Sequence, residues 1–255
     1  LMIRRPPIST RKESSAASDV YKRQVYTSAF TPPTTPLTAV TNTKFLLNPE
    51  TSISDLSQKS EIKCFGDAAT STTQVKFAGT KSIAFDGTGD YLRLSASNDF
   101  DVSLSDITIE GWFYTTSTSD KQCLWEFYSD DNNYVRLFFE GGNGNTLRLT
   151  SSSSGTQRIN VTSSTTLSIN TWYHIAVTRT HSSGAWATYI NGTVDSSASG
   201  TESSSVSTAT WPFEIGRDQV ATDRYWNGYI QDFRITKGLA RYTANFTPPT
   251  AESQG

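Results

Sequence analysis

The chain has little of several features that mark particular classes of protein. Its 255 residues include two cysteines, Cys64 and Cys123, which are too few for a disulfide framework and form either one bridge or two thiols. Its 22 basic residues are outnumbered by 24 acidic ones, and no basic stripe is present to follow a phosphate backbone, so nucleic-acid binding is not expected. No apolar run is long enough to cross a bilayer, so membrane insertion is not expected either.

Catalytic motifs are also scarce. A glycoside hydrolase needs paired carboxylates on one strand face, but Glu110 and Glu126 each stand alone in their predicted strands, and Asp232 has no acidic partner at i±2 or i±4. No cluster of cysteine, histidine and aspartate has zinc spacing, and no glycine-rich phosphate loop contains a lysine. His174 and His181 have no Gly-x-Ser-x-Gly elbow to serve. The sequence therefore predicts that the protein is not an enzyme.

The residues that are abundant favour β-structure. Aromatic residues make up 12% of the chain and charged residues 18%, and serine and threonine are frequent. Aromatic and β-branched side chains fit the half-buried surface of a sheet, whereas serine and threonine hydroxyls compete with the backbone bonds of a helix. This balance indicates an extracellular β-sandwich or barrel.

Short alternating segments separated by turn residues predict many strands. Residues 107–114 alternate between two faces, and Asn191-Gly192 is a strong hairpin signal. Strands are expected at residues 82–85, 91–94, 107–114, 124–128, 134–139, 146–150, 157–162, 172–180, 185–190, 211–216 and 226–236. No stretch from 44 to 236 has helical periodicity, although one helical turn is expected within residues 237–243. The pattern predicts an all-β, antiparallel two-sheet β-sandwich of the jelly-roll type.

Three aromatic residues and one histidine are expected to be structural. Trp112, Trp172 and Tyr189 lie in predicted strands with apolar neighbours, so we expect them to fill the core, where large aromatic side chains stabilise most. His174 lies in the same kind of segment and is expected to be half-buried and structural rather than a catalytic base.

The two ends of the chain differ from its middle. Residues 1–24 are basic, resemble a translated adapter sequence and are excluded from the predicted fold, with a disordered basic tail as the alternative. Residues 26–36 (YTSAFTPPTTP) and 242–252 (YTANFTPPTAE) share one frame. We interpret residues 25–43 as a Pro/Thr-rich linker ending an upstream domain, 44–249 as the sandwich and 250–255 as the next linker. This interpretation predicts a tandem array of domains.

Four motifs occur in the order and spacing of a known family. They are SIAFDGTGDYL at 82–92, ITIEGWFY at 107–114, NTWYHIAVTR with ATYINGTV within 170–194, and FEIGRD with WNGYIQDFRITKGLARYT within 213–243. Together they resemble the laminin-G-like jelly-roll domains of the concanavalin A-like lectin/glucanase superfamily. The last motif also resembles domains in virion and tail-associated proteins of marine bacterial viruses. The resemblance implies two stacked sheets, one concave and one convex.

The resemblance also implies a function. It indicates a non-catalytic recognition or adhesion module that binds a glycan or a cell-surface protein, in a multidomain extracellular or virion-surface protein. Two alternatives remain open, namely a structural spacer or decoration domain without a soluble ligand, and an atypical glycan hydrolase.

One calcium site follows from the same resemblance. Domains of this family often hold a calcium ion between the turn after the first hairpin strand and the last strand, which corresponds here to Asp86 and Asp232. The alternative is that Asp86 caps its turn and that Asp232 pairs with Arg234 or another cation.

Two loops combine aromatic rings, which stack on sugars, with polar groups that hydrogen-bond to them. The candidate ligand-binding residues of the first loop are Arg217, Asp218, Asp223, Arg224, Tyr225 and Asn227. The second loop contains Tyr128, Asp130, Asn132 and Tyr134. Each loop is also consistent with an ordinary solvated connection held by aromatic anchors.

Overall fold

The structure is a computed structural model that describes residues 42–47, 52–57, 59–103, 105–202, 206–221 and 223–251. The predictions for residues 1–24, and most of those for 25–43 and 250–255, lie outside this part of the chain. The only described helix is the short 3₁₀ helix Asn98–Phe100. No described helix has the length and apolar character that crossing a membrane requires.

The strands of the described residues form two antiparallel sheets. Sheet A contains β1 (Thr43–Leu47), β3 (Ala69–Ser71), β4 (Ser82–Asp86), β6 (Ile107–Thr115), β11 (Trp172–Thr180), β12 (Ala185–Ile190), β13 (Thr193–Thr201) and β15 (Asn227–Lys237). Sheet B contains β2 (Ile62–Phe65), β5 (Tyr91–Leu94), β7 (Lys121–Asp130), β8 (Asn133–Glu140), β9 (Thr146–Ser153), β10 (Thr156–Thr166) and β14 (Phe213–Ile215). Every predicted strand is present, β13 is the returning arm of the Asn191-Gly192 hairpin, and β1, β2 and β3 are additional.

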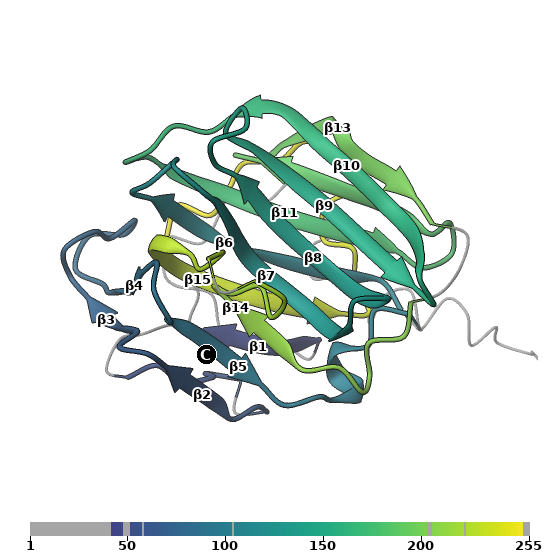
Figure 1. The fold of residues 1–255 in the computed structure, drawn as a ribbon, viewed down its shortest axis with the longest axis horizontal. Coiled ribbons are helices and arrows are strands. Elements are labelled where there is room, and N and C mark those ends of the chain that lie inside the picture. The colour runs from purple at the N-terminus through teal and green to yellow at the C-terminus, as the bar shows by residue number, and fades with distance from the viewer. Residues whose placement is uncertain are drawn as a thin grey trace, which may run out of the picture. The chain divides into compact units, whose positions relative to one another are not determined.

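The two sheets stack face to face as a sandwich, with β7 to β10 in front of β6, β11 and β15 in Figure 1. Sheet A has the order β13-β12-β11-β6-β15-β4-β3, and β1 pairs with the second half of β15. Sheet B has the order β10-β9-β8-β7-β14-β5-β2. The predicted antiparallel two-sheet β-sandwich is therefore confirmed.

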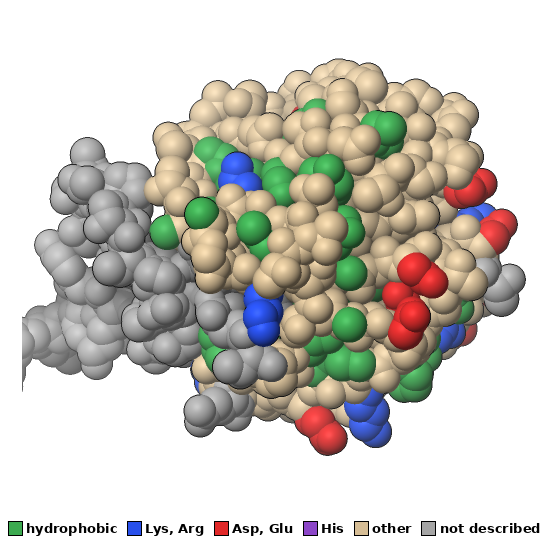
Figure 2. Space-filling view, turned by 90° about the vertical axis from the view of Figure 1, so that its left-hand side faces the viewer, with side chains coloured by type: hydrophobic (Ala, Val, Ile, Leu, Met, Phe, Trp, Pro, Cys, Tyr) green, Lys and Arg blue, Asp and Glu red, His purple; other side chains and the backbone are tan. Residues whose placement is uncertain are grey.

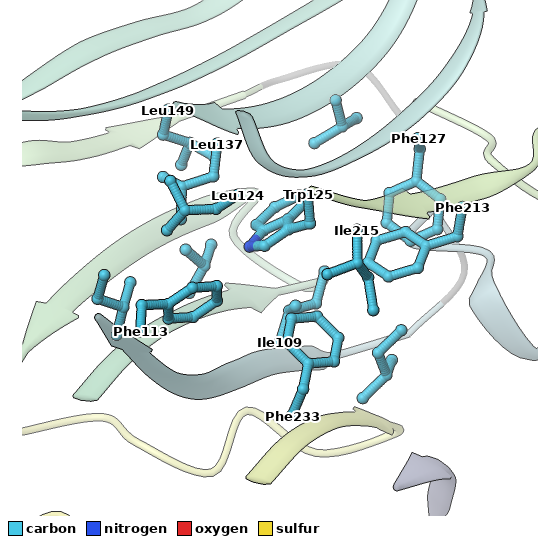
Figure 3. Close-up of a cluster of buried hydrophobic side chains, with 14 of the residues drawn as sticks. Ile109, Phe113, Leu124, Trp125, Phe127, Leu137, Leu149, Phe213, Ile215 and Phe233 are labelled. Carbon is cyan, nitrogen blue, oxygen red and sulfur yellow. The ribbon is translucent and has the colours of Figure 1, made fainter. Parts of the chain in front are cut away.

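Alternation along the strands decides which side chains enter the space between the sheets. Ile109 and Phe113 of sheet A and Trp125 and Phe213 of sheet B belong to one buried hydrophobic cluster. Figure 3 shows these side chains converging from the two layers. Each such side chain contributes roughly 1.5–3 kcal/mol through the apolar area that it removes from water.

The prediction that Trp112, Trp172 and Tyr189 fill the core holds only in part, because Trp112 and Tyr189 are buried but all three lie outside the hydrophobic cluster between the sheets. Phe113 points between the sheets, so its neighbour Trp112 points to the opposite side, which we call the outer face of sheet A. Trp112 and Tyr189 are nevertheless buried there, while Trp172 is half-buried. Other segments must therefore cover part of the outer face.

One covering segment is residues 239–248, which we call the closing strap. Its Tyr242 and Phe246 rings stack at 3.5 Å between centroids, and the Phe246 N–H donates to the Gly192 carbonyl at 2.7 Å. The helical turn expected within residues 237–243 does not form, because residue 237 ends β15 and residues 238–243 are irregular. The strap instead has an irregular backbone, and its Tyr242 and Phe246 rings pack against Tyr189 on the outer face of sheet A.

A buried ionic network lies beneath the closing strap. The Glu110 carboxylate accepts hydrogen bonds from Arg234 at 2.7 and 3.0 Å and from the Tyr242 hydroxyl at 2.5 Å. His174 is buried, with Nε2 3.4 Å from Glu110, so it is structural but more deeply placed than predicted. Burial alone would raise the pKa of Glu110, but the charges of Arg234 and Arg241 and the contact with His174 together outweigh burial and hold that pKa below its ordinary value.

Candidate ligand-binding site

Three aspartates gather where the β4–β5 turn meets the end of β2. Asp67, Asp86 and Asp90 each place one carboxylate oxygen within 4.8 Å of the other two. Asp90 accepts hydrogen bonds from the backbone N–H groups of Asp86 at 2.9 Å and Asp67 at 2.7 Å, which holds the two segments together. We call this group the acidic cluster.

The local sequence explains why the cluster forms. Gly87 and Gly89 both have positive φ, 84° and 82°, a conformation that the Asp-Gly-Thr-Gly-Asp turn requires and that glycine adopts without strain. The Thr88 N–H donates to Asp86 at 2.6 Å, so Asp86 does cap its turn while its side chain stays exposed. Burial raises the pKa of Asp90, and the nearby charge of Asp86 raises it further. The cluster therefore carries repulsion that a cation would relieve.

The acidic cluster lines one side of an open hollow of about 440 Å³. The hollow is also lined by Thr116, Asn227 and Tyr229 and by Ala84 and Phe85 of β4. Asn227 is directly opposite Asp86 in the β15–β4 register and hydrogen-bonds to the Thr116 hydroxyl at 2.6 Å. The hollow thus combines hard oxygen ligands with neutral hydrogen-bonding groups and one aromatic ring.

Three aromatic residues continue from the hollow across the outer face of sheet A. Tyr229 on β15 lies opposite Tyr114 on β6, and Tyr114 lies opposite Trp172 on β11. The ring centroids are 5.8 Å apart for Tyr229 and Tyr114 and 5.3 Å apart for Tyr114 and Trp172. We call these three side chains the aromatic row.

Neighbouring segments leave the two ends of the aromatic row partly accessible. Phe77 packs edge-on against Trp112, and the Lys76 ammonium lies 3.9 Å from the centre of the same ring. The closing strap covers Glu110 and His174 on the other side. Tyr229 and Trp172 remain half-buried, and Tyr114 between them is 8% exposed. The half-buried rings of Trp172 and Tyr229 suit stacking against a flat apolar ligand surface, with the buried Tyr114 ring between them.

The structure separates the residues of the first predicted loop. The charged side chains of Arg217, Asp218 and Arg224 form ion pairs on the outer face of sheet B. Asp218 is fully buried between Arg136 at 3.2 Å and Arg224 at 2.7 Å. Arg217 lies over the Tyr91 ring at 4.4 Å.

The other three candidates of that loop lie differently. Asp223 is exposed and Tyr225 is half-buried, while Asn227 faces the hollow. Of the six candidates in the first loop, Asn227 is the one that lines the same hollow as Tyr229 and the acidic cluster. In the second predicted loop, the Tyr128 hydroxyl donates to Asp131 at 2.9 Å, and Asp130 accepts from the Asn133 amide, so this turn satisfies much of its own polar surface.

The two residues predicted to bind calcium lie on different strands and are not opposite each other. Asp86 is opposite Asn227 at the start of β15, whereas Asp232 lies five residues further on, at a bulge with φ of 54°. The charge of Asp232 helps to raise the pKa of Arg234, in agreement with the alternative interpretation of that residue. The structure thus groups Asp86 with Asp67 and Asp90 rather than with Asp232.

Sequence reasoning missed a second acidic pair. Glu126 on β7 is directly opposite Glu214 on β14, although each stands alone in its own strand. Both side chains are fully buried beneath residues 216–221, whose Gln219 N–H donates to Glu126 at 2.6 Å. A substrate cannot reach these carboxylates in this arrangement, so the pair does not restore a hydrolase site.

Comparison with known proteins places the fold. The family model described as the concanavalin A-like lectin/glucanases superfamily matches residues 86–240, and the chain belongs to this superfamily. No curated protein is significantly similar to the chain.

Solved structures extend the comparison. Domain 4 of AbnA, an extracellular GH43 arabinanase from Geobacillus stearothermophilus determined with arabinotriose, is 21% identical with a TM-score of 0.61, covering 77% of this chain and 93% of that one. The binding domain of botulinum neurotoxin serotype D is 15% identical with a TM-score of 0.59, over 76% of this chain. The present chain spans 48% of that toxin domain. At these identities the likeness establishes the shared fold.

Proposed function

We propose that the protein is a non-catalytic glycan-binding module whose ligand lies along the aromatic row and ends in the hollow. The observation that carries the proposal is the line of Trp172, Tyr114 and Tyr229 running directly into a hollow lined by Asn227 and the acidic cluster. Aromatic faces bind the apolar faces of sugar rings, and the amide and carboxylates hydrogen-bond to hydroxyl groups.

The acidic cluster supports a cation as part of the same site. Three carboxylates with one oxygen each within 4.8 Å suit the oxygen preference and relaxed geometry of Ca²⁺. A bound calcium ion would neutralise the cluster and leave Asn227 to hydrogen-bond with the ligand. The fold supports glycan binding because the arabinanase domain, whose structure was determined with arabinotriose, shares it. We further propose an extracellular or virion-surface location, with the module repeated in a tandem array.

The test is glycan binding by the wild type and four variants, measured by calorimetry or on a glycan array. Trp172→Ala and Tyr229→Ala should each weaken binding by about tenfold or more, because each removes one stacking ring. Tyr225→Ala, in the loop outside the aromatic row, and Tyr128→Ala, on sheet B, are the matched aromatic controls and should bind as the wild type does.

The outcomes separate the alternatives. Loss of binding with Tyr225→Ala but not with Trp172→Ala would move the site to residues 217–226 and contradict the proposal. A folded wild-type protein that binds no glycan, while tandem copies associate, would favour a structural spacer.

A further inference from the structure

The outer face of sheet B carries a second set of side chains that the aromatic row does not use. Lys63 on β2, Arg93 on β5 and Glu214 on β14 lie in one line across three neighbouring strands. Figure 1 shows β2, β5 and β14 side by side at the lower part of this sheet. Leu92 and Leu94 point into the core, so Arg93 and the residues in register with it point outward.

The line places two cations directly opposite each other. Like charges at opposing positions of an antiparallel pair are destabilising unless a counter-charge is near. Arg93 has a counter-charge, because its guanidinium lies 3.3 Å from the Glu214 carboxylate. Lys63 is exposed and forms no ion pair with any described residue. Glu61 lies two residues before Lys63, just ahead of β2, and forms no ion pair with Lys63.

A third cation shares the same carboxylate. The Arg217 Nε lies 3.5 Å from Glu214, so two guanidiniums converge on one carboxylate that is itself fully buried. The Arg93 side chain is 40% exposed and that of Arg217 is 22% exposed. The carboxylate of Glu214 is therefore buried, whereas the guanidiniums of Arg93 and Arg217 reach solvent, so the surface here carries more cationic than anionic groups.

An aromatic layer borders the cations. The Phe65 and Tyr91 rings stack at 4.3 Å with an interplanar angle of 2°, and Arg217 lies over Tyr91. This stack lies two residues along the strands from Lys63 and Arg93, on the side where Asp67 follows Phe65 and Asp90 precedes Tyr91. It separates the cations from the acidic cluster and places flat apolar surface beside them.

We propose that Lys63, Arg93 and Arg217 form a binding site for the carboxylate or sulfate groups of an acidic polysaccharide, distinct from the aromatic row. The planar guanidiniums match the two oxygens of such an anion in a bidentate manner, and Lys63 adds a point charge. Glu214 holds both arginines in position from below, and the Phe65–Tyr91 stack contacts the sugar ring that carries the anion. This site exists although the whole chain has a net charge of −2.

The test compares alginate, heparin and dextran as carboxylated, sulfated and neutral probes of the full chain. We expect alginate or heparin to bind, in a manner that weakens with added salt, and dextran not to bind at this site. Lys63→Gln combined with Arg93→Gln should weaken binding by about tenfold or more. Arg93→Lys should also weaken it, because the charge remains but the bidentate geometry is lost.

The controls make the proposal falsifiable. Lys81→Gln changes the net charge in the same direction outside this site and should leave binding unchanged, and Trp172→Ala should leave it unchanged because the aromatic row is separate. An unaffected Lys63→Gln/Arg93→Gln protein with native near-ultraviolet circular dichroism would overturn the proposal. Equal loss with Lys81→Gln, or equally tight binding of single-stranded DNA, would overturn it in favour of general attraction to polyanions.

Discussion

Glu126 on β7 and Glu214 on β14 lie directly opposite each other, and neither side chain reaches solvent. Burial is the main reason why the pKa of Glu126 rises from 4.5 to about 8, and the charges of Asp218 and Glu214 add to it. Burial also raises the pKa of Glu214, to about 6, while Arg217 and Arg93 oppose that rise. Glu126 and Glu214 therefore stay protonated at pH values between 4.5 and their raised pKa, where exposed glutamates would be ionised.

This pair predicts a stability that falls as pH rises. Below about pH 4.5 both glutamates are protonated in the folded and the unfolded chain, so they contribute no difference. Between pH 4.5 and about 8 the folded chain binds the extra proton of Glu126, so unfolding becomes easier as pH rises. Glu126→Gln should therefore raise the melting temperature at pH 8.5, by roughly 2–4 °C for each kcal/mol, and have little effect at pH 4.5.

The measurement is a thermal melt of Glu126→Gln and wild type at both pH values. Glutamine keeps the carbonyl oxygen that accepts from Gln219, so the variant changes the charge and preserves that contact. Glu61→Gln, at an exposed position, is the control and should leave the melting temperature unchanged. An equal stabilisation at the two pH values would contradict the assignment.

The closing strap should depend on one hydroxyl. Tyr242→Phe keeps the ring that stacks on Phe246 but removes the donor to buried Glu110, at a cost of about 1–3 kcal/mol. The expected result is faster hydrogen exchange of the Phe246 amide, which bonds to the Gly192 carbonyl. Thr243→Ala, at an exposed strap position, should exchange as the wild type does. Unchanged exchange in Tyr242→Phe would show that the aromatic contacts alone hold the strap.

A calcium ion at the acidic cluster should stabilise the fold. We expect added Ca²⁺ to raise the melting temperature and a chelator to reverse the effect, because a ligand that binds only the folded state stabilises it. Asp67→Asn or Asp86→Asn should abolish the response, whereas Asp130→Asn, at an exposed position on β7, should retain it. A melting temperature that is the same with calcium and with chelator would remove the cation from the proposed function.

The two cysteines should behave as independent thiols. Cys64 is exposed on β2 and Cys123 is buried on β7, and the structure leaves both unbridged. Burial raises the pKa of each thiol, and that of Cys123 by far the more. Iodoacetamide should therefore label Cys64 slowly in the native protein and Cys123 only after unfolding, as mass spectrometry of the alkylated peptides would reveal. A difference in electrophoretic mobility between reduced and non-reduced samples would instead indicate a disulfide bridge between Cys64 and Cys123.

The strands could be predicted because their signal is local. The bounds of β5, β11 and β12 match the prediction, since alternation and turn residues act over a few neighbouring positions. Trp112 and Tyr189 were correctly predicted to be buried, but not between the sheets, although alternation puts Trp112 on the side opposite to Phe113. A large aromatic residue suggests the core, and only the closing strap and residues 74–80 explain why a ring on the outer face is buried.

The candidate site depended on pairing between strands that are distant in the chain. Tyr114, Trp172 and Tyr229 come from three strands, and their alignment follows from the registers β15–β6 and β6–β11. The same holds for Glu126 with Glu214, which a search for spacing within one strand does not find. A slip of one residue in any register would turn these side chains to the other face.

The amino-acid sequence by itself determined the fold class, the strands and the Asp-Gly-Thr-Gly-Asp turn, because side-chain alternation and glycine conformation act locally. Only the tertiary structure decided which aromatic rings stay accessible, which aspartates share a cluster and which carboxylates are buried together. These properties depend on strand register and on the segments that cover each outer face, and both are settled by contacts between residues far apart in the chain.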